Sequence, residues 1–290
     1  MLPAPLRKFG NSYYELEKLN IDEYPEVYTV RDKSLNIYIL KNYKKDLPPE
    51  KLIKEAKICA LLSKKSPQFF LNYISNSIDE YYVREKYIVV EYAEKGSLNN
   101  YILSGNFFEE KLAKITMWKI ICGVKVIHEN GIAHRTISLK NIFLDRNYNV
   151  KIGGFEFAKM FGIENARNKD CIKLFEEDIF KLRILLVQLI SGRLDLNTIK
   201  GTIKKSIQKG NFEYFWKIIK SQYIQSEVNI SLELIDLVNI MLSHKTSDIN
   251  ILLNHDWFSG FNSLSQCELK EMEIYMIEEL KKYEGVNHTD

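Results

Sequence analysis

The eight residues from His134 to Asn141 read HRTISLKN, and their types and spacing could do chemistry. Phosphoryl-transfer sites use the frame H-R-D-x-x-x-x-N, in which the aspartate accepts the proton of the substrate hydroxyl and the asparagine holds a magnesium ion. In this chain Thr136 stands at the aspartate position. Because a threonine hydroxyl is no useful proton acceptor near neutral pH, the stretch keeps the spacing of such a site without its base.

The elements that would position this stretch change in character along the chain. Over the first ninety residues, EVYTV, NIYIL and KYIVVEY are rich in Val, Ile and Tyr and predict strands. Between the second and third strands, Pro48 and Pro49 precede apolar residues at helical spacing, which predicts a helix. After Tyr92 most of the chain has helical patterns, with short strands expected near IFLD and NVKI.

Six segments, in the right order, resemble parts of a eukaryotic protein kinase domain from about Tyr14 to Phe258. IYILK resembles the strand that carries the ATP-positioning lysine, here Lys41. LIKEAKI resembles the helix whose glutamate, Glu55, pairs with that lysine, and VVEYA resembles the hinge. The catalytic loop, EEDIFKL at the start of the central helix, and the closing LLNHDWF follow.

The resemblance implies an α+β, bilobal protein-kinase fold. Residues 1–92 are expected to form an N-lobe with an antiparallel sheet and one helix, and residues 93–262 a mainly helical C-lobe. Residues 263–290 form a C-terminal extension, in which apolar residues along one face predict an amphipathic helix. Packing against its own domain is the expected role of that helix, and partner binding is the alternative.

The resemblance also places the residues of a phosphoryl-transfer site, and several are substituted. Ser138 stands where serine/threonine kinases carry a lysine that steadies the transferring phosphoryl group. The metal-binding D-F-G reads Gly154-Phe155-Glu156, and glycine has no side chain to bind Mg²⁺. Asn141 is left as a vestigial metal ligand. Glu156 is expected to point elsewhere, with a role as surrogate ligand kept as an alternative.

The phosphate cradle is replaced as well. The family's glycine-rich loop corresponds to residues 20–27, which read NIDEYPEV and contain no glycine. Pro25 has no N–H to offer a phosphate, and the acidic side chains here repel the charge of ATP. This loop is expected to be a poor phosphate clamp.

The resemblance further implies a vestigial nucleotide pocket between the lobes. Ile39 replaces a small alanine, and Phe143 stands at the floor position. The extra carbons favour a pocket filled by its own side chains, and a purine that still fits is the alternative. The residues expected around this pocket are Lys41, Glu55, Val27, Ile39, Val90, Glu91, Ala93 and Phe143.

The segment from Gly154 to Asp178 is shorter than active kinases usually carry and has no A-P-E motif. The arginine that would pair with that motif is absent before the closing helix as well. Residues around Asn165 and Arg167 are expected to form a solvated loop, with partner contact as the alternative. By resemblance, His134 and Phe155 are stacked core residues, Asp178 holds the catalytic-loop backbone, and Arg135 usually meets an activation-loop phosphate.

Composition narrows the class of protein. The formal net charge is +3 with interspersed signs, which argues against a nucleic-acid partner. Four widely spaced cysteines without a CxxC pair indicate reduced thiols. The first residues lack the apolar region of a signal peptide, and the apolar run 184–190 is too short to span a bilayer. A cytoplasmic or otherwise intracellular protein is expected.

Together these features favour a pseudokinase, a protein kinase domain without catalytic activity that acts as a protein-binding signalling scaffold or allosteric regulator. The partners would be proteins, among them an active kinase or a phosphorylation substrate. No cofactor is expected. Two alternatives stay open, an ATP-binding conformational switch, with or without Mg²⁺, and a weak, unconventional serine/threonine kinase.

Overall fold

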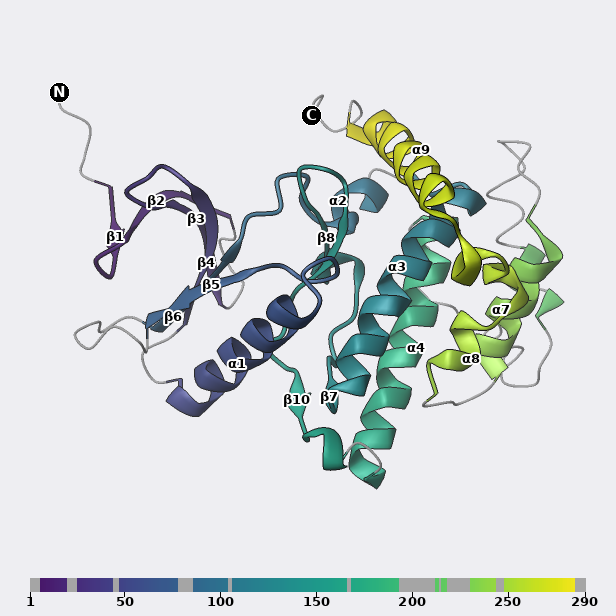
Figure 1. Cartoon of the computed structure of the whole chain (residues 1–290), viewed down its shortest axis with the longest axis horizontal. Coiled ribbons are helices and arrows are strands. Elements are labelled where there is room, and N and C mark those ends of the chain that lie inside the picture. Colours follow the sequence, from purple (N-terminus) through teal and green to yellow (C-terminus); the bar gives the residue numbers. More distant parts are fainter. Residues whose placement is uncertain are drawn as a thin grey trace.

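The computed structural model describes residues 6–19, 25–43, 47–77, 86–103, 106–165, 168–192, 212–213, 215–217, 230–243 and 248–284. The chain forms two lobes with the expected α+β architecture (Figure 1). The first lobe is a curled antiparallel sheet with one helix, and the second is mainly helical. The bilobal fold predicted from the sequence is therefore confirmed.

Six antiparallel strands form the N-lobe sheet, in the spatial order β1-β2-β3-β4-β6-β5. The sequence patterns identified β3, β4 and β6, and they missed the other three. β1 has two residues, and β2 and β5 begin with tyrosines but do not alternate clearly between polar and apolar side chains. The strands are β1 (Lys8–Phe9), β2 (Tyr13–Lys18), β3 (Glu26–Arg31), β4 (Ile37–Tyr43), β5 (Tyr73–Asn76) and β6 (Lys86–Glu91).

Both faces of the sheet are covered by apolar side chains. Leu40 points to the face away from α1, where it belongs to a buried apolar cluster that includes Phe9 of β1. Ile39 and Tyr43 lie one and three residues from Leu40 on the same strand and point to the opposite face, because successive side chains of a strand alternate. There they meet Leu52 and Ala56 of helix α1 (Pro49–Lys65), which begins after Pro48 as predicted. The alternation of β4 thus decides which residues face the second lobe.

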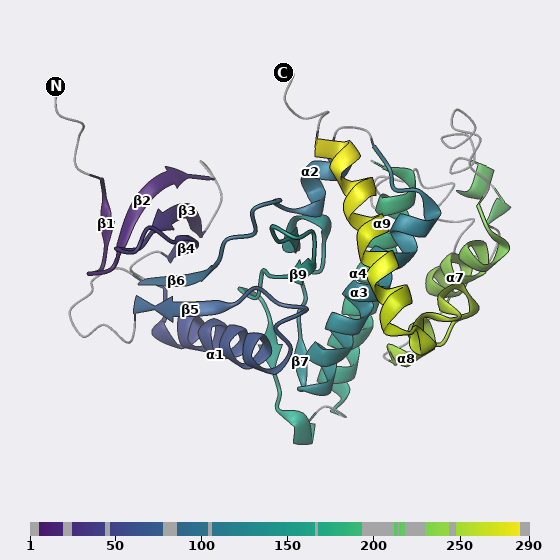
Figure 2. The same ribbon diagram turned by 45° about the horizontal axis from the view of Figure 1, so that its top comes forward.

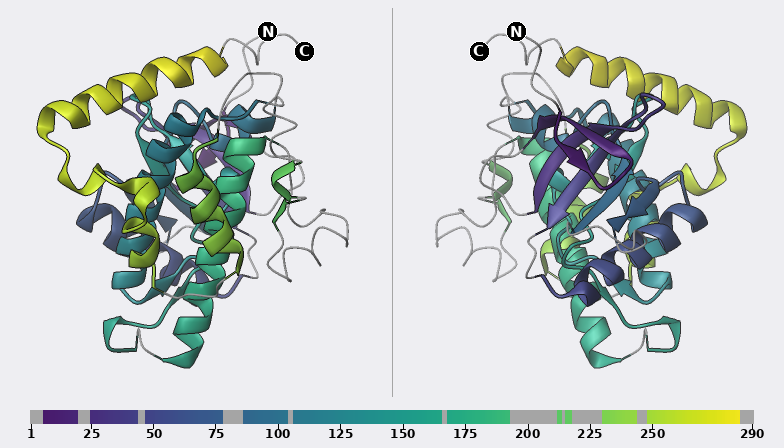
Figure 3. Two further views of the ribbon diagram at one scale, coloured as in Figure 1. Left: turned by 90° about the vertical axis from the view of Figure 1, so that its right-hand side faces the viewer. Right: turned by 90° about the vertical axis from the view of Figure 1, so that its left-hand side faces the viewer.

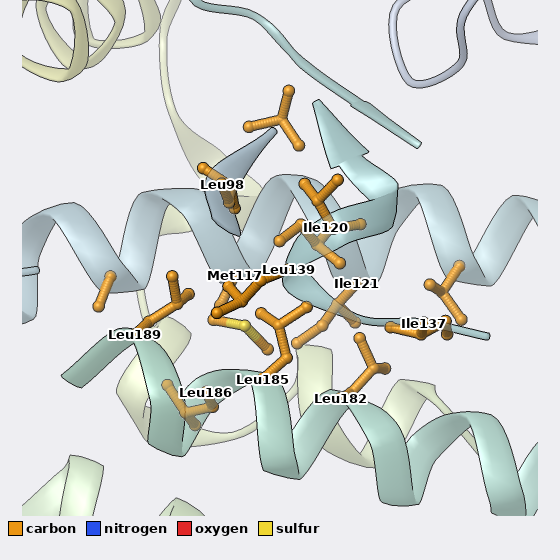
Figure 4. Close-up of a cluster of buried hydrophobic side chains, with 14 of the residues drawn as sticks. Leu98, Met117, Ile120, Ile121, Ile137, Leu139, Leu182, Leu185, Leu186 and Leu189 are labelled. Carbon is orange, nitrogen blue, oxygen red and sulfur yellow. The ribbon is translucent and has the colours of Figure 1, made fainter. Parts of the chain in front are cut away.

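Two long helices, α3 (Glu110–Glu129) and α4 (Lys169–Ser191), run side by side through the C-lobe and form its core (Figures 1 and 4). Met117 and Ile121 of α3 meet Leu182 and Leu185 of α4 in this cluster. All four side chains are fully buried, so the two helices form a rigid base for the loops above them. The other C-lobe helices are α2 (Leu98–Leu103), α7 (Leu232–Ser243), α8 (Asn250–Leu253) and α9 (Gln266–Glu284), with 3-10 turns η2 (Leu139–Asn141), η3 (Ile163–Asn165), η5 (Asp256–Phe258) and η6 (Phe261–Ser263).

Two small antiparallel sheets carry the loops of the candidate site. β8 (Ile142–Leu144) pairs with β9 (Val150–Ile152), which confirms the short strands predicted there. β7 (Ile132–Ala133) pairs with β10 (Lys159–Met160). The first sheet places the end of η2 beside the segment that follows β9, and the second ties the segment after Gly154 back to the end of α3.

Helix α4 begins earlier than the sequence predicted. A helix was expected from about Glu176, with a solvated loop before it, but α4 starts at Lys169. The Asn168 side chain caps the helix by accepting a hydrogen bond from the Asp170 N–H. One turn apart, Cys171 and Phe175 are buried against Ala133. This packing turns the second half of the expected loop into helix; Arg167 lies outside the described residues.

Helix α9 crosses the outside of the C-lobe, as Figure 3 shows from two sides. Met276 and Leu280 are buried in the main core, with Met272 and Ile277 packed around them. The predicted amphipathic helix is confirmed, and its apolar face packs against its own domain.

Two further sequence features have an outcome in the structure. All four cysteines are free thiols. Among the described residues, no helix has both the length and the apolar character that crossing a membrane requires, and the apolar run 184–190 lies inside α4.

We expect Gly131→Ala to destabilise the protein more than Gly260→Ala. Both glycines have positive φ, +63° and +85°, which costs an alanine about 1 kcal/mol. A Cβ on Gly131 would also lie 2.2 Å from the carbonyl oxygen of Gly162, whereas a Cβ on Gly260 meets nothing within 4 Å. Urea unfolding should show a loss of about 1 kcal/mol for Gly260→Ala and about 3 kcal/mol or more for Gly131→Ala. Equal losses would contradict the close approach of the two loops.

Candidate functional site

The structure brings the predicted site residues together between the lobes. Lys41 on β4 and Glu55 on α1 reach in from the N-lobe. Thr136, Asn141 and Gly154 come from the C-lobe, from the loop after β7, the end of η2 and the segment after β9. Ser138 lies just before η2, where its backbone carbonyl accepts a hydrogen bond from the Asn141 N–H.

Lys41 forms the ion pair with Glu55 that the resemblance implies, with Nζ 3.3 Å from Oε1. The Glu55 side chain is 2% exposed, and its second oxygen accepts a hydrogen bond of 2.5 Å from the Tyr43 hydroxyl. Tyr43 was missed from the sequence. It lies two residues beyond Lys41 on the same strand, so the period of two that places Lys41 inward also places Tyr43 there. The pair is therefore fixed from both sides by the protein itself.

The prediction that the Glu156 side chain points away from the site is wrong. The Glu156 carboxylate bonds directly to Lys41 Nζ, from the segment of the other lobe that follows Phe155. Burial by itself would lower the pKa of Lys41, but the charges of Glu156 and Glu55 outweigh burial and raise that pKa. Lys41 is thus a cation held between two carboxylates.

The two carboxylates share this cation unequally. Burial would raise the pKa of Glu156, but Lys41 outweighs burial and lowers it. The pKa of Glu55 is raised, by burial first and by the charge of Glu156, despite the opposing effect of Lys41. A polyphosphate that approached Lys41 would meet the negative charge of Glu156 already in place.

Thr136 uses its hydroxyl to connect the catalytic loop to the segment after β9. The hydroxyl donates to the Gly154 carbonyl oxygen at 3.0 Å, and the Thr136 N–H donates to His134 Nδ1 at 3.3 Å. Since Nδ1 accepts, the proton of His134 lies on Nε2, which donates to the Gly153 carbonyl oxygen at 2.9 Å. At the position where the family has its base, this chain has a structural crosslink.

The Asn141 side chain fills the space that a side chain at position 154 would need. Gly154 has φ of +80°, and a Cβ built on it would lie 2.4 Å from Cγ of Asn141. The Asn141 amide nitrogen donates to the Thr136 carbonyl oxygen at 2.7 Å. Any larger residue at position 154 would push the amide out of this bond. Neither of the two positions that hold metal in the family offers a carboxylate oxygen, the ligand that Mg²⁺ favours.

No other metal site stands out in the part of the chain that the structure describes. Within it, no group of three or more His, Cys, Asp or Glu side chains is placed to hold a metal ion. Glu156, the alternative ligand weighed from the sequence, has its carboxylate on Lys41 instead.

Of the expected pocket residues, Val27, Ile39, Lys41 and Val90 share one face of the sheet and Phe143 lies on β8, whereas Glu91 pairs with Tyr38 on the other face. Ile39 pairs with Val90 across β4 and β6, and Val27 pairs with Lys41 across β3 and β4. Phe143 lies against Gly153, where an added Cβ would be 3.0 Å from the ring. Val90 and Ala93 are buried, and Val27, Ile39, Glu91 and Phe143 are half-buried. The self-filled pocket stays a prediction. Residues 20–24, most of the predicted phosphate cradle, lie outside the described residues.

Asp178 is fully buried and holds the catalytic loop, as the resemblance implies. Its carboxylate accepts hydrogen bonds from the backbone N–H groups of His134 at 2.8 Å and Arg135 at 2.6 Å. His128 Nε2 lies 3.0 Å away as a third partner. The Arg135 guanidinium donates to the Phe157 carbonyl oxygen at 3.1 Å.

The stacked core residues also lie where the resemblance places them. The rings of His134 and Phe155 lie 4.8 Å apart, and Phe155 continues to Phe70 at 6.2 Å. Phe70 follows α1 in the chain and forms a backbone bridge with Ile152 of β9. Through this stack, the catalytic loop packs against the segment that joins α1 to β5.

Comparison with known proteins agrees with this geometry. The protein kinase domain family matches residues 13–175, so the chain belongs to the protein kinase domain family. It is 30% identical over 175 residues to the serine/threonine-protein kinase GIN4 of Saccharomyces cerevisiae, which covers 54% of this chain and 14% of that protein. It is 24% identical over 230 residues to a probable serine/threonine-protein kinase KIN1 homolog of Enterocytozoon bieneusi, covering 74% of this chain and 36% of the relative. The chain thus spans a minor part of the length of these relatives.

We expect the stability of the protein to fall below pH 6.5 partly through His134. Burial lowers the pKa of this fully buried imidazole below 6.5, so the unfolded chain takes up a proton that the folded protein excludes. The free energy of unfolding should decrease by up to about 1.4 kcal/mol per pH unit below pH 6.5. His134→Phe keeps an aromatic ring and cannot titrate, so its unfolding free energy should change less between pH 7.5 and 5.5. The same pH dependence in both proteins would contradict a neutral His134.

Proposed function

We propose that this chain is a pseudokinase, a protein kinase domain that acts by binding proteins, as a signalling scaffold or allosteric regulator inside the cell. One observation carries the proposal. The three catalytic-loop and metal positions, Thr136, Asn141 and Gly154, are bonded and packed to one another. These three residues offer neither a free proton acceptor to a substrate nor a carboxylate to a metal ion.

The ion pairs of Lys41 support the same proposal from the other lobe. In an active site this lysine would bind phosphate, but here it is held by Glu55 and Glu156. Glu156 comes from the C-lobe segment, so the pair joins the lobes without a ligand. A fixed arrangement of the two lobes would present a partner protein with a binding surface of constant shape. An active kinase or a kinase substrate fits this role.

A second candidate function, an ATP-binding switch or a weak serine/threonine kinase, is favoured by a specific observation. The Lys41–Glu55 pair is intact, and Glu156 supplies a carboxylate in the same site. If nucleotide displaced Glu156 from Lys41, the lobes would lose one connection and that carboxylate would be free for other chemistry. The similarity to serine/threonine-protein kinases is compatible with this function.

We expect no phosphotransfer from the purified protein. With the proton acceptor and the metal carboxylate both absent, incubation with radiolabelled ATP, Mg²⁺ or Mn²⁺ and a generic protein substrate should give no signal above a blank. The Lys41→Ala variant is the control for contaminating kinases. A signal in the wild type that disappears in Lys41→Ala would overturn the pseudokinase proposal and establish the weak kinase.

We expect Glu156→Gln to bind ATP better than the wild type, because the change removes the carboxylate that competes for Lys41. A ligand that binds only the folded state stabilises it by about 2.7 kcal/mol at a hundredfold excess over Kd, which thermal unfolding detects as a rise in Tm. At millimolar ATP the wild type should show no rise, and Glu156→Gln should show one that Lys41→Ala abolishes.

Glu50→Gln, which removes an exposed carboxylate from α1, is the matched control and should behave as the wild type. A Tm rise in the wild type would support the switch. No rise in any variant would contradict the competition by Glu156 and place the obstacle at Ile39 and Phe143.

A further inference from the structure

The last turn of α9 contacts the connection between the two lobes. The helix is anchored in the core by Met276 and Leu280 and ends at Glu284. In Figures 1 and 2 this end lies beside α2 and the loop that leads to it from the N-lobe. The segment between Glu91 and Leu98 is the connection between the two lobes.

Glu284 binds three side chains that are far apart in the sequence. Lys95 Nζ lies 3.0 Å from Oε1, and the Tyr148 hydroxyl donates to Oε2 at 2.8 Å. The Tyr101 hydroxyl donates to Oε1 at 3.4 Å. Lys95 also lies 4.8 Å from the centre of the Tyr148 ring. One carboxylate thus joins the interlobe connection, α2 and the turn between β8 and β9.

The charges of this cluster favour its ionised form. Burial would raise the pKa of Glu284, but the hydrogen bonds from Tyr148 and Lys95 outweigh burial and lower it. The hydrogen bond to Glu284 raises the pKa of Lys95. Both groups therefore stay charged around neutral pH. Both are about one-third exposed, so the hydrogen bonds give the contact its specificity more than the ion pair alone.

Backbone hydrogen bonds connect the segment around Lys95 to β8, which carries a residue of the candidate nucleotide pocket. The Lys95 N–H donates to the Leu144 carbonyl oxygen at 3.2 Å, and the Leu144 N–H donates to the Gly96 carbonyl oxygen at 2.9 Å. Ser97 forms a backbone bridge with Phe143, the expected floor of the pocket. The segment that Glu284 holds is thus bonded directly to the strand that carries Phe143.

A partly open pocket lies beside the middle of α9. A cavity of about 240 Å³ lies between α9, α3 and the β8–β9 turn, lined by Lys119, Tyr148 and Glu273 among others. The Lys119 and Glu273 charges across it are 3.8 Å apart. The last turn is held by Glu284 and by Tyr283, whose ring packs on Phe108 at 5.4 Å and whose hydroxyl donates to the Phe107 carbonyl oxygen at 2.8 Å.

We propose that α9 is a C-terminal latch, in which Glu284 fixes the interlobe connection and β8, so that release of its last turn loosens the floor of the pocket between the lobes. A binding event on α9 would then be transmitted to the interlobe site through Lys95 and Tyr148. The latch works whether or not nucleotide binds, and it does not depend on the absence of catalysis.

Hydrogen–deuterium exchange of the full chain, read by mass spectrometry, tests the latch with Glu284→Gln. We expect roughly three- to tenfold faster exchange in the last two turns of α9, and also in residues 93–97 and in β8. Lys95→Met should reproduce the effect from the opposite side. Glu278→Gln, which removes an exposed carboxylate from the same helix, is the matched control and should leave all three segments unchanged.

Faster exchange confined to α9 would overturn the proposal, because α9 would then be a passive cover. Exchange of α4 reports on the whole fold. If α4 also loosens in Glu284→Gln, the milder Tyr148→Phe, which removes one hydroxyl donor and keeps the ring, decides the question. It should raise exchange in residues 93–97 and β8 with α4 unchanged, and no rise there would equally overturn the latch.

Discussion

The buried carboxylate of Asp178 is the interaction on which the rest of the site depends. It holds two successive backbone N–H groups of the catalytic loop against α4, and the N–H of Arg135 points to it although that residue has a φ of +70°. A fully buried carboxylate is stable only when donors satisfy it, so the loop and the helix require each other. This requirement is the same whichever residue stands at position 136, so the frame of the loop is compatible with Thr136 there.

The contacts around that frame join, within the protein, groups that a nucleotide and its metal bridge in an active kinase. In an active site the lysine, the metal residues and the phosphates meet through the ligand. Here Glu156 meets Lys41 directly, Thr136 donates to the Gly154 carbonyl oxygen, and the Asn141 amide donates to the Thr136 carbonyl oxygen. The N-lobe and C-lobe are therefore connected by a direct ion pair between Lys41 and Glu156.

The sequence predicted those parts of the fold and site that follow from local pattern or family spacing. Alternation along β4 places Lys41 toward Glu55, and the spacing of the catalytic loop identifies Thr136 and Asn141. The partner of Glu156 could not be predicted, because it depends on the path of the chain between the lobes. The early start of α4 left a signal that was missed, a capping Asn168 followed by Cys171 and Phe175 at helical spacing.

The composition of the segment between Gly154 and the first turns of α4 has a covalent consequence. From Gly154 through Asp178 the chain contains no serine, threonine or tyrosine, so the segment after Phe155 offers no hydroxyl to phosphorylate. Arg135, which would face such a phosphate, binds the Phe157 carbonyl instead. A phosphate carried on this segment itself therefore cannot order or release it. A phosphorylation that controlled the protein would have to lie elsewhere on the chain.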